Sequence, residues 1–146
     1  MSGNPSDGTY GMSHVTTGGA TAAPALPYLP PRPRHYRPRI GLIGCGGISE
    51  YHLRAYRAMD LDVVALCDLD AERAQRRQQE FFPAAVVFSD YRELLRRDDV
   101  AVVDVALHPA DRVTVIAAAL RARKHVLSQK PFVLDLADGE RLVALA

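Results

Sequence analysis

Lysine, cysteine, excess charge and long apolar runs are all scarce in this chain of 146 residues. Only Lys124 and Lys130 are lysines, so arginine carries nearly all of the positive charge. The formal net charge is +1, which gives no reason to expect nucleic acid or an anionic membrane as a partner. No apolar run reaches the ~20 residues of a membrane span, and the N-terminus lacks the basic-then-apolar order of a signal peptide. We therefore expect a cytoplasmic protein.

The two cysteines, Cys45 and Cys67, both lie in apolar segments. Cysteines placed in this way usually serve as small buried apolar side chains in a reducing compartment. We therefore predict neither a disulfide nor a metal site.

Residues 1–38 differ in composition from the rest of the chain, since they hold seven of the ten prolines and five of the ten glycines. A segment with so few large apolar residues cannot offset the entropy cost of ordering its backbone. Residues 24–34 favour a polyproline II conformation, which could dock on an aromatic groove. A disordered leader, or a misplaced start codon, is the simpler interpretation, and we expect no functional residue there.

After residue 38 the pattern becomes regular. Five short apolar runs have the length and composition of buried strands; they cover residues 39–43, 61–67, 84–88, 100–107 and 125–128. Helical segments alternate with them, over residues 48–59, 70–81, 91–97, 110–123 and from 135 onward. This alternation predicts an α/β fold with right-handed crossovers. We predict a Rossmann doubly wound parallel sheet, in strand order 3-2-1-4-5, over residues 39–128.

A glycine-rich turn joins the first strand to the first helix: Gly44, Cys45, Gly46, Gly47, Ile48 and Ser49. Gly44 permits the tight turn, and Gly46 lets a pyrophosphate approach the backbone. Amides of the following helix N-terminus, at Gly47 and Ile48, then face the phosphates. Ser49 takes the third small position, where helix and strand approach closely. The turn predicts a nucleotide site.

Asp68 follows the second strand, about where an acidic residue binds the adenosine ribose hydroxyls. Its charge would repel the 2′-phosphate of NADP, so NAD is favoured over NADP. Asp68 could instead be a turn or capping residue, although Asp70 can fill that role. S-adenosylmethionine methyltransferases and FAD-binding domains share this arrangement, so the turn by itself leaves three cofactor classes open.

Gln129, Lys130 and Pro131 follow the fifth strand, at the sheet edge where doubly wound folds bind their ligands. A lysine there, near a nicotinamide, can donate a proton or hydrogen bond to a substrate oxygen during hydride transfer. The alternative is an ordinary solvated lysine.

Four blocks of the sequence resemble the glucose–fructose oxidoreductase/inositol dehydrogenase (Gfo/Idh/MocA) family. They are residues 41–48 with His52 and Leu53, residues 64–68, residues 88–94, and residues 118–131 with Lys124-His125-Val126 and Lys130-Pro131. The resemblance implies an NAD(P)-dependent oxidoreductase that acts on a sugar, polyol or related hydroxyl or carbonyl compound. It also implies a catalytic or substrate-positioning role for Lys130.

The resemblance extends to the residues around the expected nicotinamide. Gln129 stands where the family usually has glutamate, which removes a negative charge beside Lys130. His108 and Pro109 replace the family's usual threonine–proline pair, and His108 could contact cofactor or substrate or be a plain turn residue. The residues expected to bind the cofactor are Gly44, Gly46, Gly47, Ile48, Asp68, His108, Pro109, Gln129 and Lys130.

Family members continue into a second domain that supplies most of the substrate pocket. We therefore expect residues 129–146 to begin a linker to a C-terminal substrate domain absent from this chain, and the chain to be a fragment inactive by itself. Any homo-oligomer would form through that missing domain. The alternative is a non-catalytic dinucleotide-binding module or sensor subunit that shares every motif before Ser128.

Overall fold

The computed structural model describes residues 22, 24–26 and 35–146. The chain divides into two units, Met1–Arg32 and Pro33–Ala146. The leader expected over residues 1–38 lies mostly outside the described residues, so its disorder stays a prediction. The helices and strands described below all belong to the second unit.

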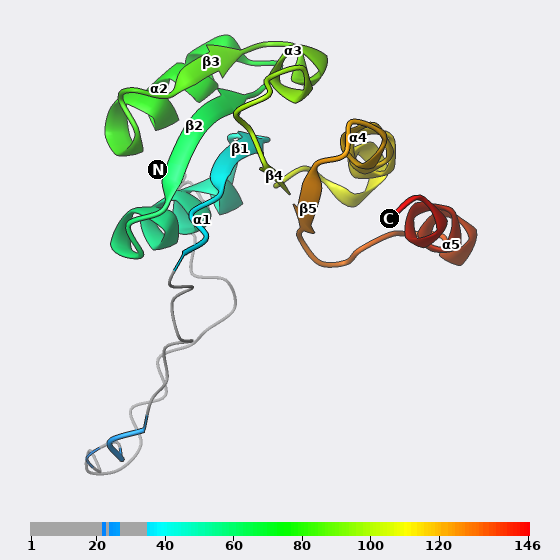
Figure 1. Ribbon diagram of the computed structural model, residues 1–146, viewed down its shortest axis with the longest axis horizontal. Helices are drawn as coiled ribbons and strands as arrows, with labels where there is room; N and C mark the ends of the chain where they lie inside the picture. The colour runs from blue at the N-terminus through cyan, green and yellow to red at the C-terminus, as the bar shows by residue number, and fades with distance from the viewer. Residues whose placement is uncertain (1–21, 23, 27–34) are drawn as a thin grey trace, which may run out of the picture. The chain divides into compact units, whose positions relative to one another are not determined.

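Strands and helices alternate along the second unit (Figure 1). The strands are β1 (Arg39–Ile43), β2 (Asp62–Cys67), β3 (Val86–Phe88), β4 (Val102–Val105) and β5 (His125–Ser128). The helices are α1 (Gly47–Ala58), α2 (Ala71–Phe81), α3 (Tyr91–Leu95), α4 (Pro109–Arg121) and α5 (Leu136–Leu145).

The five strands form one sheet in the order β3-β2-β1-β4-β5. Every neighbouring pair is parallel. The predicted fold class and strand order are therefore confirmed. Strands β2 and β3 are added on one side of β1 and strands β4 and β5 on the other. Such a switch point between β1 and β4 opens a crevice at the carboxyl ends of the strands.

Alternate residues of each strand pack against different helix layers, as parallel sheets with helices on both faces require. On β1, Ile40 and Leu42 belong to a core cluster that contains Leu53 of α1 and Ala74 of α2. Ile43 belongs to a second cluster with residues of α3, α4 and α5. Figure 1 shows α5 beyond β5, beside α4, and Leu142 of α5 is buried in that second cluster.

Aspartate side chains cap the first turns of α2 and α3. Asp70 caps α2 by accepting a hydrogen bond from the Arg73 amide at 3.1 Å, and Asp90 caps α3 through the Arg92 amide at 2.8 Å. Helix α4 begins one residue earlier than predicted, at Pro109. Proline is well tolerated at the first helical position, because the amide hydrogen that it lacks would have no partner within the helix there.

Strand β4 is shorter than the predicted run over residues 100–107. Ala101 and Ala106 still donate to the β1 carbonyls of Arg39 and Ile43, at 2.9 and 2.8 Å. The ends of the run thus bond to β1 outside the regular ladder. Both cysteines are free and buried, as expected, and burial raises the pKa of each thiol to about 12.

Candidate functional site

The residues predicted to bind a cofactor lie after β1, β2, β4 and β5, at the carboxyl edge of the sheet. Backbone hydrogen bonds join these strand ends. Gly44 donates to the Cys67 carbonyl at 2.8 Å, and Ala106 donates to the Ile43 carbonyl at 2.8 Å. Motifs far apart in the sequence therefore meet along one edge.

Replacing Gly44 with any other residue would require the backbone of the turn to rearrange. Its φ is +98°, a conformation that side chains disfavour. A Cβ atom there would also lie 2.8 Å from the Ala106 carbonyl oxygen. The glycine lets the turn after β1 pass close to the end of β4.

Gly46 and Gly47 have the opposite surroundings. A Cβ atom at either position would meet no atom within 4 Å, so the space above both residues is open. Gly46 is the N-cap of α1 and its backbone is extended. Ser49 is wholly buried under the turn, and its hydroxyl bonds the Gly46 carbonyl, which fits the close helix–strand approach expected of this position.

A cleft of about 520 Å³ opens beside the turn. Its lining comes from the glycine turn and from α2: Cys45, Gly46, Gly47, Arg73, Arg76, Arg77 and Glu80. Free amides at the start of α1 carry the positive end of the helix dipole, and three guanidinium groups face the same space. These groups suit an anionic pyrophosphate. The residues present thus fit the phosphates of a dinucleotide.

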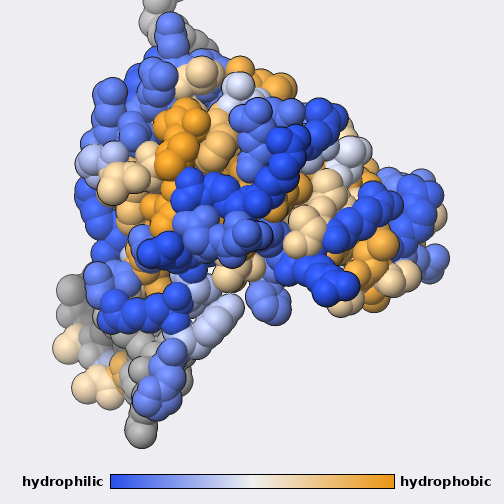
Figure 2. Space-filling model, turned by 45° about the horizontal axis from the view of Figure 1, so that its top comes forward, coloured by the Kyte–Doolittle hydropathy of each residue, from blue (hydrophilic) through white to orange (hydrophobic). Residues whose placement is uncertain are grey.

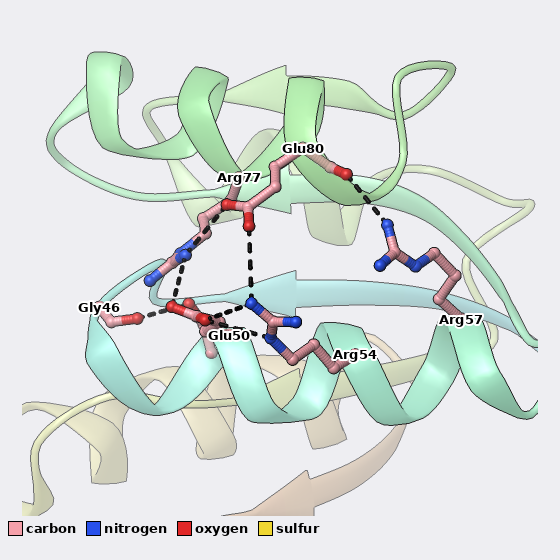
Figure 3. Close-up of polar contacts among 7 residues, drawn as sticks. Gly46, Glu50, Arg54, Arg57, Arg77 and Glu80 are labelled. Atoms are coloured by element: carbon pink, nitrogen blue, oxygen red, sulfur yellow. Dashed lines mark hydrogen bonds and ion pairs between the residues drawn. The ribbon is translucent and has the colours of Figure 1, made fainter. Parts of the chain in front are cut away.

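The α2 wall of the cleft is fixed to α1 through Glu50 (Figure 3). The Glu50 carboxylate accepts from Arg54 at 2.8 Å and from Arg77 of α2 at 3.0 Å. These arginines hold the pKa of Glu50 below its usual range. Arg57 adds a hydrogen bond to the Glu80 carbonyl at 3.2 Å. Sequence reasoning did not find this cluster, because its members belong to two helices separated by a strand.

Asp68 lies against the glycine turn. One carboxylate oxygen accepts from the Cys45 amide at 2.7 Å, and the other accepts from the Asp70 amide at 2.9 Å. Arg73 lies 3.5 Å from the same carboxylate. The next residue, Leu69, is 93% exposed, so a large apolar side chain is presented beside Asp68.

The segment after β5 is held by a buried arginine that sequence analysis did not single out. Arg112, in the first turn of α4, is only 2% exposed. Its guanidinium donates to the carbonyls of Leu107, Gln129 and Pro131. Burial lowers the pKa of Arg112. The only sequence signal was its place in the first turn of α4, just after the His108-Pro109 pair.

Arg112 thereby links the end of β4 to the segment that carries Lys130. Gln129 is half-buried and Lys130 is exposed, at the carboxyl edge of the sheet, and the Lys130–Pro131 peptide bond is cis. His108 is exposed and is the N-cap of α4, without a side-chain capping bond.

A family model that matches most of the chain shows which family the protein belongs to. The model described as "Oxidoreductase family, NAD-binding Rossmann fold" of the Gfo/Idh/MocA group matches residues 38–146. This chain belongs to the Gfo/Idh/MocA family. Of the three cofactor classes that the glycine turn left open, the family selects the nicotinamide dinucleotide.

Other members of the Gfo/Idh/MocA family are similar to the chain in sequence. Inositol 2-dehydrogenase of Salmonella typhimurium is 35% identical over 107 residues, which are 72% of this chain and 32% of that protein. The dTDP-3,4-didehydro-2,6-dideoxy-alpha-D-glucose 3-reductase of Actinomadura kijaniata is 40% identical over 110 residues, 74% of this chain and 32% of the relative. The chain thus spans about a third of the length of these relatives.

Solved structures of the family share the fold. The A. kijaniata 3-ketoreductase, in complex with NADP and TDP-benzene, aligns with a TM-score of 0.71 at 38% identity, covering 76% of this chain and 34% of the other. The myo-inositol dehydrogenase of Lactobacillus casei, in complex with NAD(H) and myo-inositol, aligns with a TM-score of 0.71 at 26% identity, covering 75% and 33%.

Two further findings concern the described residues only. No helix among them is long and apolar enough to cross a membrane. Within the same part of the chain, no three histidine, cysteine, aspartate or glutamate side chains are grouped so that they could hold a metal ion.

Proposed function

We propose that residues 39–146 bind NAD along the carboxyl edge of the sheet and form the cofactor half of an oxidoreductase. The observation that carries this proposal is the open space above Gly46 and Gly47, at the start of α1 and beside three arginines. Gly44, Gly46, Gly47 and Ile48 would hold the pyrophosphate. Asp68 would hold the adenosine ribose, and the exposed Leu69 would contact the adenine ring.

The nicotinamide would lie toward the other switch-point strands, where His108, Pro109, Gln129 and Lys130 stand. When bound, the nicotinamide accepts or supplies a hydride at a substrate carbon. Lys130 would donate a proton or hydrogen bond to the substrate oxygen. Arg112 would hold the backbone on both sides of Lys130 through the Gln129 and Pro131 carbonyls.

The substrate class and the domain plan are also proposals. The relatives act on inositol or on a nucleotide-linked deoxysugar, as their names state. We infer a sugar or polyol substrate, bound mainly by a second domain to which residues 129–146 lead. Large apolar side chains are exposed along this segment: Phe132, Leu134, Leu136, Val143 and Leu145. Figure 2 shows hydrophobic surface on the lobe that carries α5, and a second domain would cover it.

Cofactor binding is tested by titrating the chain with NADH and following its fluorescence, for the wild type and for Gly46→Ala. A methyl group at Gly46 meets no protein atom, so the melting temperature should not fall. The methyl would occupy the space next to the pyrophosphate, so the affinity for NADH should drop about tenfold or more. Equal affinities, or no binding by the wild type, would contradict the proposal.

The catalytic role is tested separately with Lys130→Ala in a protein that includes the substrate domain. Turnover of NAD should be lost while NADH still binds, because Lys130 is not part of the pyrophosphate site. Full turnover by this variant would remove Lys130 from the mechanism. A protein that binds NADH but shows no turnover with any sugar or polyol would instead be the non-catalytic module.

A further inference from the structure

A buried carboxylate lies at the centre of the sheet, in a place that the proposed function does not use. Asp104 is in the middle of β4 and has no solvent exposure. Its Oδ2 atom lies 2.6 Å from His52 Nδ1 and 2.7 Å from the Tyr56 hydroxyl, both on α1. Its Oδ1 atom has no hydrogen-bond partner among the described residues. Burying such a group is costly, and the fold of a parallel sheet does not require it.

The contacts of His52 extend from this carboxylate to the catalytic segment. The second ring nitrogen, Nε2, lies 2.9 Å from the side-chain nitrogen of Gln129. The side-chain oxygen of Gln129 in turn accepts from the backbone amide of Lys130 at 2.9 Å. A continuous chain therefore runs from Asp104 through His52 and Gln129 to Lys130.

Only one arrangement of protons satisfies every bond in this chain. The Lys130 amide can only donate, so the oxygen of Gln129 must face it and the Gln129 NH₂ must face His52. His52 Nε2 must then accept, which requires a neutral ring with its proton on Nδ1. That proton is donated to Asp104, beside the proton donated by Tyr56.

A second proton on the His52 ring is incompatible with this arrangement of hydrogen bonds. Nε2–H would then point at the NH₂ group of Gln129, so two donors would face each other. If the Gln129 amide rotates to offer its oxygen to His52, its NH₂ turns toward the Lys130 amide and the same conflict appears there. Protonation of His52 therefore costs one of the two bonds of Gln129, either the bond to His52 or the bond to the Lys130 amide.

We propose that Asp104 and His52 are positioning residues for Lys130, acting through the side-chain amide of Gln129, and that protonation of His52 breaks this link. The inference rests on the proposed function only in taking Lys130 as the catalytic group. The side-chain amide of Gln129 has one donor end and one acceptor end, and this makes the link depend on the protonation state of His52.

The groups that face His52 come from three places. Asp104 of β4 is the charged one, and its hydrogen bond raises the pKa of His52 above the usual value of 6.5, against the opposing effect of burial. Tyr56 lies on the same helix, and its ring is nearly perpendicular to the His52 ring, with the two centroids 6.4 Å apart. The segment after β5 offers Gln129, which is neutral. The charges of α2, on Arg77 and Glu80, pair with Glu50 and Arg54 of α1, and Asp62 of β2 pairs with Arg39.

The test is a pH titration of the ¹⁵N-labelled chain by NMR, which needs no cofactor. Imidazole nitrogen spectra should show the neutral His52 ring with its proton on Nδ1. The Lys130 amide resonance should move upfield as pH falls, with an inflection at the pKa of His52. In His52→Gln this movement should vanish, whereas in His125→Gln, which removes an exposed histidine of β5, it should remain.

The decisive variant is Gln129→Glu, because a carboxylate can accept from a protonated His52 and from the Lys130 amide together. The pKa of His52 should rise by about one unit or more, and the Lys130 amide should keep its bonded resonance through that titration. A neutral His52 with its proton on Nε2, or a Lys130 amide indifferent to His52, would overturn the proposal.

Turnover gives a second readout. In a protein with its substrate domain, activity should fall about tenfold per pH unit below the pKa of His52, and His52→Gln should lack this acid limb. An acid limb that persists in His52→Gln would refute the link to catalysis. If the chain failed to bind NADH, the proposed function would be lost while the NMR result would still decide the link among His52, Gln129 and Lys130.

Discussion

Asp68 and Arg73 together set the charge that the adenosine ribose would meet. Both oxygens of Asp68 accept backbone amides, and Arg73 lies 3.5 Å from one of them. The carboxylate would repel a 2′-phosphate, while Arg73, 48% exposed, could turn toward it. The expected preference for NAD therefore depends on the balance between these two side chains.

The balance can be shifted in either direction by single substitutions. Asp68→Ala should relax discrimination against NADP, and Arg73→Ala should strengthen it, because the first removes a negative charge and the second removes its positive neighbour. Dissociation constants for NADH and NADPH measure both. Arg76→Ala is the matched control on α2, since Arg76 pairs with Glu72 and not with Asp68. Unchanged selectivity in Asp68→Ala would refute the ribose assignment.

His52 should make stability depend on pH in a known direction. The bond to Asp104 raises its pKa in the folded chain, so the folded state binds the proton more tightly than the unfolded state does. The resulting stabilisation is complete below the unfolded pKa of about 6.5 and is lost as pH rises through the folded value. The difference in free energy of unfolding between the wild type and His52→Gln should therefore be largest at pH 5–6 and smallest at pH 9. Urea melts at a series of pH values measure this, and a gap that widens with pH would contradict the assignment.

At the scale of elements, α4 fixes the segment after β5 through one side chain. Arg112→Met would remove the guanidinium donor that the carbonyls of Leu107, Gln129 and Pro131 share. An unsatisfied buried carbonyl costs about 1–3 kcal/mol, and these bonds are part-buried, so the free energy of unfolding should fall by about 1 kcal/mol or more. Arg121→Met, at an exposed position on the same helix, should change it by less than about 0.5 kcal/mol. Equal effects of the two variants would show that Arg112 does not clamp this segment.

Local patterns were sufficient for the elements and insufficient for their contacts. The apolar runs, the glycine turn and the capping aspartates are all encoded within a few residues, so the strand order and Ser49 at the helix–strand contact could be anticipated. The bond between His52 and Asp104 joins residues 52 positions apart. Nothing local marks that pairing, although Asp104 was already the one charged residue in an apolar run. Arg112 was likewise hidden, because an arginine on a helix is usually exposed.

For the whole molecule, we propose that the dinucleotide lies along the carboxyl edge of the sheet. The motifs at Gly46, Asp68, His108 and Lys130 meet only at that edge, which no single motif reveals. The strand beginnings, at Arg39, Asp62 and His125, lie at the opposite edge.

Mapping the backbone amide shifts of the ¹⁵N-labelled chain during titration with NAD⁺ tests this claim most directly. We expect shifts at residues 44–48, 68–69, 108–109 and 129–130, and none at Arg39, Asp62 or His125. Shifts gathered at the strand beginnings, or no saturable shift at all, would contradict it.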